Sequence, residues 1–165
     1  MLTLPKIIER AEQPYAFIDY TVRIDQMQVP ADDGFSRLFP FLGEQGIAPT
    51  AAPFYNYRRI NMADTLDVEA GVPVDRVGTD GAGIRFGTLP AGRYVTIEWH
   101  GHFDALEQVT AMLIGWVRLT GQRFDMHEVD GSDHFACRLE IYETNPVEVP
   151  DPKDWVTTLA FKLAD

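Results

Sequence analysis

Hydrophobic and polar residues alternate along several short stretches of the chain, and this period of two predicts strands. In the stretch Leu139-Glu140-Ile141-Tyr142, the two aliphatic side chains point to one side and Glu140 and Tyr142 to the other. Similar short stretches rich in apolar, β-branched and aromatic residues predict strands at 15–20, 54–57, 65–69, 94–99 and 156–161. The chain therefore has enough strands for a sheet with one strongly apolar face.

A different period predicts a helix over 104–120. Apolar residues recur there at the 3.6-residue spacing of one helix face, at Leu106, Val109, Leu113, Trp116 and Val117. Gly101 marks a break before this helix, and Gly121 is placed to end it.

A second helix is expected to open at 30–33, with Phe35, Leu38, Phe39 and Leu42 on its apolar face and Gly43 or Gly46 at its end. Pro40 lies inside this pattern, and an interior proline breaks a backbone hydrogen bond. We therefore expect this helix to be irregular.

A segment of the first half of the sequence is similar to a segment of the second half. Residues 15–20 (YAFIDY) align with 94–99 (YVTIEW), and each stretch leads into a helix and then two strands. We expect a single α+β domain over 1–165, with repeat one at about 4–74 and repeat two at about 83–165. Each repeat would be a strand-helix-strand-strand unit. Together they would form a curved antiparallel sheet with two helices on one face and a central groove. Pro90-Ala91-Gly92 is typical of a hairpin turn.

Charge and cysteine content restrict the kinds of partner and bond that the chain is expected to form. With 25 acidic and 14 basic residues the net charge is −11, and Arg58-Arg59 is the only adjacent basic pair, so direct nucleic-acid binding is disfavoured. Cys137, the single cysteine, excludes an internal disulfide and is expected to be buried. No signal-peptide core and no apolar run near the ~18 residues of a membrane helix are visible, so we expect a cytoplasmic protein that does not bind membranes.

With this layout the sequence resembles the gyrase-inhibitor-like (GyrI-like) small-molecule-binding domain, which is also the effector-binding domain of bacterial multidrug-responsive transcription activators. The resemblance covers nearly the whole chain. It is carried by Gly71-Val72-Pro73-Val74, Leu89-Pro90-Ala91-Gly92-Arg93-Tyr94, His100-Gly101-His102-Phe103, Trp116 and Leu139-Glu140-Ile141-Tyr142.

The resemblance implies a groove that accepts hydrophobic, often cationic, compounds, with an acidic residue at the position of Glu140. It implies no cofactor. The family's activators carry a separate helix-turn-helix region for which this chain has no room, so we expect a standalone binding member. Any transcriptional control would then need another protein, and the candidate protein partners are a regulator or gyrase. Some standalone relatives hydrolyse cyclopropane-containing alkylating toxins and others bind gyrase, so an enzyme and an interaction module stay open as alternatives.

The candidate ligand-binding residues follow from this groove. Glu140 would attract a cation, Tyr142 would donate a hydrogen bond, and aromatic rings would hold a flat or cationic ligand. The candidate lining rings are Tyr57, Trp116, Tyr55 and Trp99. If the chain were an enzyme, Glu140 would act as general base and Tyr142 as proton donor. We consider binding the better hypothesis.

Three other segments are weaker candidates. His100 and His102 have a spacing that could serve a metal, but a role at the start of the helix is favoured, and no metal site is predicted. The acidic stretch 125–134 lacks the register of a calcium loop and is expected to be a solvated connection. The glycine-rich stretch 78–87 is expected to be a hairpin or a linker between the halves.

Overall fold

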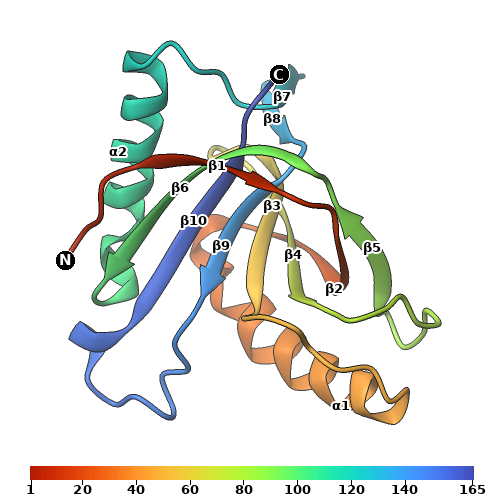
Figure 1. Ribbon diagram of the computed structural model, residues 1–165. Helices are drawn as coiled ribbons and strands as arrows, with labels where there is room; N and C mark the ends of the chain where they lie inside the picture. Colours follow the sequence, from red (N-terminus) through yellow and green to blue (C-terminus); the bar gives the residue numbers. More distant parts are fainter.

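The computed structural model describes residues 1–165, and a curled antiparallel sheet forms its centre (Figure 1). The strand order is β1-β6-β10-β9-β3-β4-β2-β5, and the β7–β8 hairpin branches from β3. The strands are β1 (Lys6–Arg10), β2 (Gln13–Val22), β3 (Phe54–Ile60), β4 (Leu66–Pro73), β5 (Arg85–Leu89), β6 (Gly92–His100), β7 (Met126–Val129), β8 (Ser132–Phe135), β9 (Arg138–Tyr142) and β10 (Val156–Lys162). Since β9 pairs with β3, the halves share one sheet.

Both helices cover the same face of this sheet, as predicted. One row of paired residues crosses the sheet on that face: Ile18, Ala70, Tyr55, Glu140, Leu159 and Ile97. At one end of the row α1 (Ser36–Glu44) packs Leu38 and Leu42 against Ile18. At the other end α2 (Leu106–Leu119) packs Val109 and Leu113 against Ile97. The middle of the row, with Tyr55 and Glu140, lies between these two helix-covered cores.

The first helix is irregular, as its proline indicates. A π-helical turn over Pro30–Phe35 precedes α1, and Pro40 lies inside α1 itself. Gly34 in that turn approaches β4 so closely that an added Cβ would lie 2.8 Å from the Cβ of Ala70. The helix stops at Glu44, and Gly46 follows in the left-handed region at φ +65°.

The predicted hairpin at Pro90-Ala91-Gly92 is wrong. The strands on its two sides do not pair with each other, because β5 pairs with β2 of the first half while β6 pairs with β1. Gly92 (φ +142°) lets the chain turn away from a hairpin path, and Pro90 has no N–H to donate to a ladder. The first strand of each half therefore pairs with the other half. Strand β1 of the first half pairs with β6, and β5 of the second half pairs with β2.

The stretch 125–134, predicted to be a solvated connection, is mostly exposed but has regular structure. It contains the β7–β8 hairpin, whose tip is Asp130-Gly131 with φ values of +51° and +77°. Positive φ at both central residues fits a type I′ turn, for which Asp-Gly is a favoured pair. The stretch 78–87 contains a tight turn in which Gly81 bridges Ile84 before β5 begins.

The helix-free face has its own core, made of Tyr15, Phe17, Phe54, Tyr94 and Leu139 among others. Cys137 belongs to it and is 2% exposed, so its predicted burial is confirmed. A buried carboxylate, Glu69, accepts hydrogen bonds from the Tyr15 hydroxyl (2.9 Å) and the Asn56 amide (2.8 Å) on this face. No helix of the protein has both the length and the apolar character needed to cross a membrane.

Candidate functional site

Glu140 and its neighbours come together where β9 meets β3. Tyr55 on β3 is the direct cross-strand partner of Glu140. Tyr57 and Tyr142 each lie two residues further along their own strands, so all four side chains project from the helix-bearing face. The alternation of apolar and polar residues therefore correctly predicted that Glu140 and Tyr142 lie on the same face of the sheet.

Two phenols converge on one oxygen of the carboxylate. The Tyr142 hydroxyl donates a hydrogen bond to Oε1 of Glu140, and the Tyr57 hydroxyl lies 3.5 Å from the same atom. No protein group donates to the second oxygen, Oε2. A carboxylate has room for about four hydrogen bonds, so Glu140 retains unused acceptor capacity.

Burial dominates the electrostatics of this cluster. It raises the pKa of Glu140 above its usual value, while the bond from Tyr142 and the nearby charge of Arg138 oppose that shift. Burial, and then the adjacent Glu140 carboxylate, raises the pKa values of Tyr57, Tyr142 and Tyr55. The three phenols therefore stay protonated over the ordinary pH range and act as hydrogen-bond donors.

Aromatic rings enclose the carboxylate from both helical sides. The Tyr55 ring meets the Tyr142 ring edge-on with centroids 5.4 Å apart, and Phe35 stacks on Tyr55 at 5.9 Å. On the α2 side, the ring centroid of Phe103 lies 5.6 Å from that of Tyr142 and 4.7 Å from that of Trp155. Phe35 comes from the turn before α1 and Phe103 from the turn before α2, so the start of each helix supplies one wall.

Four further residues of this site were not among the predicted ones: Phe35, Phe103, Arg138 and Trp155. Arg138 could have been found by the same alternation, since it precedes Glu140 by two residues. Its guanidinium carbon lies over the rings of Phe161 (4.7 Å), Phe135 (4.8 Å) and Tyr57 (5.8 Å). Trp155 directly follows a 3₁₀ turn at Pro152–Asp154, and no local sequence pattern indicates its position.

Trp99 and Trp116 lie elsewhere, although both were candidate lining residues. They pack against the hydrophobic cluster beneath α2, and the Trp99 indole donates to the His102 carbonyl (2.9 Å). The helical period placed Trp116 on the apolar face of α2, where it is half-buried, but it could not distinguish the α2 core from the ring cluster at Glu140.

Glu140 is only half-buried, so the surrounding rings leave part of it open to solvent. Glu140 does not line either of two surface hollows of about 290 and 380 Å³. No three histidine, cysteine, aspartate or glutamate side chains are grouped as metal ligands. His102 instead accepts a hydrogen bond from the Asp104 N–H (3.2 Å), which places it at the start of the helical segment as expected.

The cluster offers one carboxylate oxygen as acceptor, protonated phenols as donors and several aromatic faces. Such a set can hold a cation or an amide by charge and hydrogen bonding and a flat group by stacking. The same carboxylate could also orient a water molecule.

Comparison with known proteins agrees with this architecture. The family model for the GyrI-like small molecule binding domain matches residues 4–164. A search of curated proteins finds no match to the sequence.

Several solved structures share the fold. The EcmrR C-terminal domain superposes with a TM-score of 0.75 at 20% identity, over 98% of each chain. In the EcmrR–DNA complex the match has the same score and identity but spans 57% of the EcmrR chain. SAV2435 bound to tetraphenylphosphonium gives 0.60 at 11% identity, over 98% of this chain and 94% of that one. A hydrolase from Listeria innocua gives 0.64 at 12% identity, over 97% and 91%.

Proposed function

Because the chain belongs to the GyrI-like small-molecule binding domain family, we propose that it binds a hydrophobic, cationic or planar molecule at Glu140. The observation that carries the proposal is the free Oε2 of Glu140 among aromatic rings. A half-buried carboxylate with unused acceptor capacity is costly, and a cationic ligand would remove that cost. The structure of SAV2435 with tetraphenylphosphonium shows that a protein of this fold binds a lipophilic cation.

A ligand at this site would compete with contacts between the surrounding rings. The Tyr142 ring contacts both Tyr55 and Phe103, so a ligand that inserts between these rings would displace some of these contacts. Each aromatic pair stabilises the closed arrangement by about 0.5–1.5 kcal/mol, which a bound aromatic cation can replace by stacking on the same rings.

The test uses tetraphenylphosphonium as the probe and triphenylphosphine oxide as its neutral aromatic counterpart. The wild-type protein should bind the cation saturably in calorimetry and bind the neutral compound at least about tenfold more weakly. Glu140→Gln should abolish this preference. Glu148→Gln, an exposed glutamate in the loop after β9, is the matched control and should retain it. Equal binding of the cation by wild type and Glu140→Gln would refute the proposal.

Hydrolysis of a reactive alkylating compound is a second candidate for the same site. It is favoured by the hydrogen-bonded pair of Glu140 and Tyr142, in which the carboxylate could orient water. We rank it lower because burial raises the pKa of Tyr142 well above its usual value, which makes the phenol a weak proton donor. Turnover of an alkylating substrate by substoichiometric protein, lost in Glu140→Gln, would reverse this ranking.

In the cell we propose an effector-binding role in bacterial multidrug-responsive transcription regulation, in the cytoplasm. This rests on EcmrR, whose C-terminal domain shares the fold and whose full chain is seen on DNA. The net charge of −11 disfavours direct contact with DNA, so regulation would act through a protein partner. Gyrase is the alternative partner. A complex with gyrase that persists after mutation of Glu140 would favour an interaction module over an effector sensor.

A further inference from the structure

Two histidines face each other on the β7–β8 hairpin. His127 on β7 and His134 on β8 are direct cross-strand partners. Their imidazole rings are nearly parallel, with centroids 5.2 Å apart and an angle of 11° between the ring planes. His134 is also the register partner of Arg59 on β3, which ties the hairpin to the main sheet. The register of three strands therefore holds the two rings side by side.

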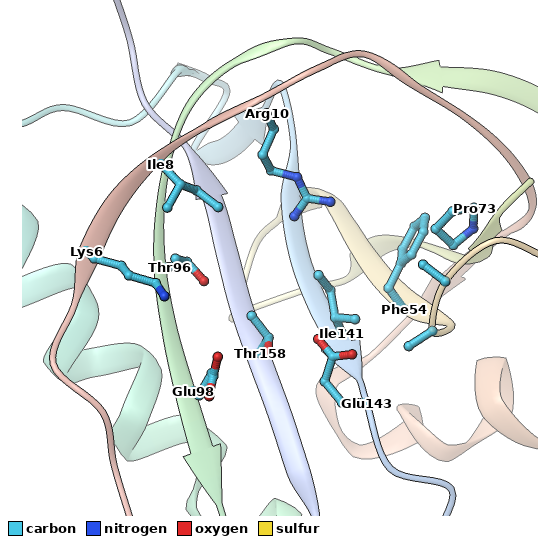
Figure 2. A pocket seen from close by; sticks show the side chains of 12 residues that line it. Lys6, Ile8, Arg10, Phe54, Pro73, Thr96, Glu98, Ile141, Glu143 and Thr158 are labelled. Carbon is cyan, nitrogen blue, oxygen red and sulfur yellow. The ribbon is translucent and has the colours of Figure 1, made fainter.

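Both rings line a surface hollow of about 380 Å³. Its other charged lining residues are Arg58, Arg59, Asp67 and Asp125, and no residue of the ring cluster at Glu140 takes part. The hollow of about 290 Å³ bordered by β1 and β9 has no histidine in its lining (Figure 2). Of these two hollows, only the one at the hairpin therefore presents imidazole nitrogens to open space.

The ring nitrogens of this pair have no partner in the protein. Neither His127 nor His134 makes an ion pair or a side-chain hydrogen bond, whereas the other two histidines each have a carboxylate nearby. Those carboxylates belong to Glu98 and Asp104, at 3.7 and 3.2 Å from a ring nitrogen. A neutral imidazole has one nitrogen with a lone pair, so each ring of the hairpin pair keeps one acceptor available.

The distance between the rings suits a shared metal ion. Imidazole is a preferred ligand of divalent zinc, nickel and copper. Two nitrogens bound to one tetrahedral ion at about 2.0–2.1 Å lie about 3.3 Å apart, so each nitrogen has to move by about 1 Å from rings separated by 5.2 Å. His127 is exposed and His134 half-buried, and the broad torsion about the Cβ–Cγ bond of histidine allows the required tilt.

The carboxylates of the hollow do not complete the ligand set. Asp67 is paired with Arg59 at 2.7 Å and Asp125 with Lys162 at 2.9 Å. No three histidine, cysteine, aspartate or glutamate side chains are grouped closely enough to hold a metal ion. Water would therefore occupy the remaining positions of an ion bound by the two imidazoles.

We propose that His127 and His134 form a two-histidine site for a divalent transition metal of the zinc, nickel and copper group. The ion would join β7 to β8 through one nitrogen of each ring. Since both ligands are in place only when the hairpin is paired, the bound ion should stabilise the hairpin. This site is separate from the one at Glu140 and does not depend on the function proposed there.

The test titrates the full chain with Zn²⁺ at neutral pH and follows the imidazole signals by NMR. One ion should bind per chain, shift the signals of His127 and His134 together, and slow amide hydrogen exchange in β7 and β8. Mg²⁺, which prefers oxygen ligands, should shift neither signal.

Three single variants locate the site. His127→Gln and His134→Gln should each lower the zinc affinity by at least about tenfold, because one imidazole cannot chelate the ion. His100→Gln, which removes a histidine outside the hairpin, is the matched control and should keep the wild-type affinity. Amide spectra of the metal-free proteins check that each variant is folded, and the exposed position of His127 makes that variant the decisive one.

Three results would each overturn the site. They are an equal zinc affinity in the wild type and in His127→Gln, shifts confined to the signals of His100 and His102, and zinc bound only between two chains, as detected by sedimentation. None of these results concerns cation binding at Glu140.

Discussion

Tyr55 lies directly across from Glu140, at the junction where β3 of the first half pairs with β9 of the second. Each of these residues is followed at two positions by a tyrosine that reaches Oε1 of Glu140, Tyr57 on one strand and Tyr142 on the other. The site is therefore built by both halves of the chain, and neither half contains it alone.

Binding of a lipophilic cation should strengthen as pH rises. Only the ionised form of Glu140 attracts a cation, and burial raises its pKa above the usual value. Affinity for tetraphenylphosphonium should therefore increase as pH passes through that raised pKa, and calorimetry at pH 5 and pH 8 would measure the change. Glu140→Gln should show no such increase, and a pH-independent affinity in the wild type would contradict the assignment.

Glu140 should lower the stability of the free protein at neutral pH. Its pKa is higher in the folded than in the unfolded state, so the folded protein holds a proton that the unfolded chain releases. The wild type should thus lose stability relative to Glu140→Gln as pH rises from about 4.5, the unfolded value, through the folded pKa. Urea unfolding of both proteins across this range would measure the difference, and a constant gap would refute it.

Tyr142→Phe should destabilise the protein more than Tyr57→Phe. The Tyr142 hydroxyl makes a close hydrogen bond to Glu140, whereas the Tyr57 hydroxyl lies at 3.5 Å. Loss of a hydrogen bond to a charged group costs about 1.5–3 kcal/mol, so we expect a loss in that range for Tyr142→Phe and less than about 1 kcal/mol for Tyr57→Phe. Chemical denaturation at one pH would test the order, and the reverse order would contradict the geometry.

Thr157→Val should leave stability unchanged or raise it by up to about 1 kcal/mol. Thr157 pairs with Tyr142 across β10 and β9, is fully buried, and its hydroxyl has no hydrogen-bond partner. Valine has nearly the same shape and removes the unsatisfied hydroxyl. Thr157→Ser keeps the hydroxyl but loses the methyl group, so it should destabilise. A loss of more than about 1 kcal/mol in Thr157→Val would show that the hydroxyl has a partner.

Two glycine-to-alanine changes should act in opposite directions. An added Cβ at Gly71 would lie 2.9 Å from the Phe54 ring and 3.2 Å from the Ala16 carbonyl, so overpacking should cost about 1–3 kcal/mol. Gly115 lies inside α2 with nothing within 4 Å of the added atom. Gly115→Ala should therefore stabilise by about 0.5–1 kcal/mol through helix propensity. Thermal unfolding should therefore show a lower melting temperature for Gly71→Ala and a higher one for Gly115→Ala than for the wild type.

The sequence by itself determined the elements that depend on local periodicity. Alternation placed Glu140 and Tyr142 on one face of β9, and the 3.6-residue spacing identified the buried face of α2. Pro40 indicated the irregular first helix. These features follow from geometry within a few residues, so the local pattern is sufficient to predict them.

Only the tertiary structure decided which strands meet and which rings lie together. The exchange of β1 and β5 between the halves depends on strand pairings distant in sequence, and the local Pro-Ala-Gly signal predicted the wrong partner. For the same reason the sequence could not show that the Phe103 ring contacts both Tyr142 and Trp155. It also could not show that Trp99 and Trp116 pack against the hydrophobic cluster at α2. Side-chain contacts across a sheet are set by register and by the packing of helices on it, and neither is encoded in the spacing of one segment.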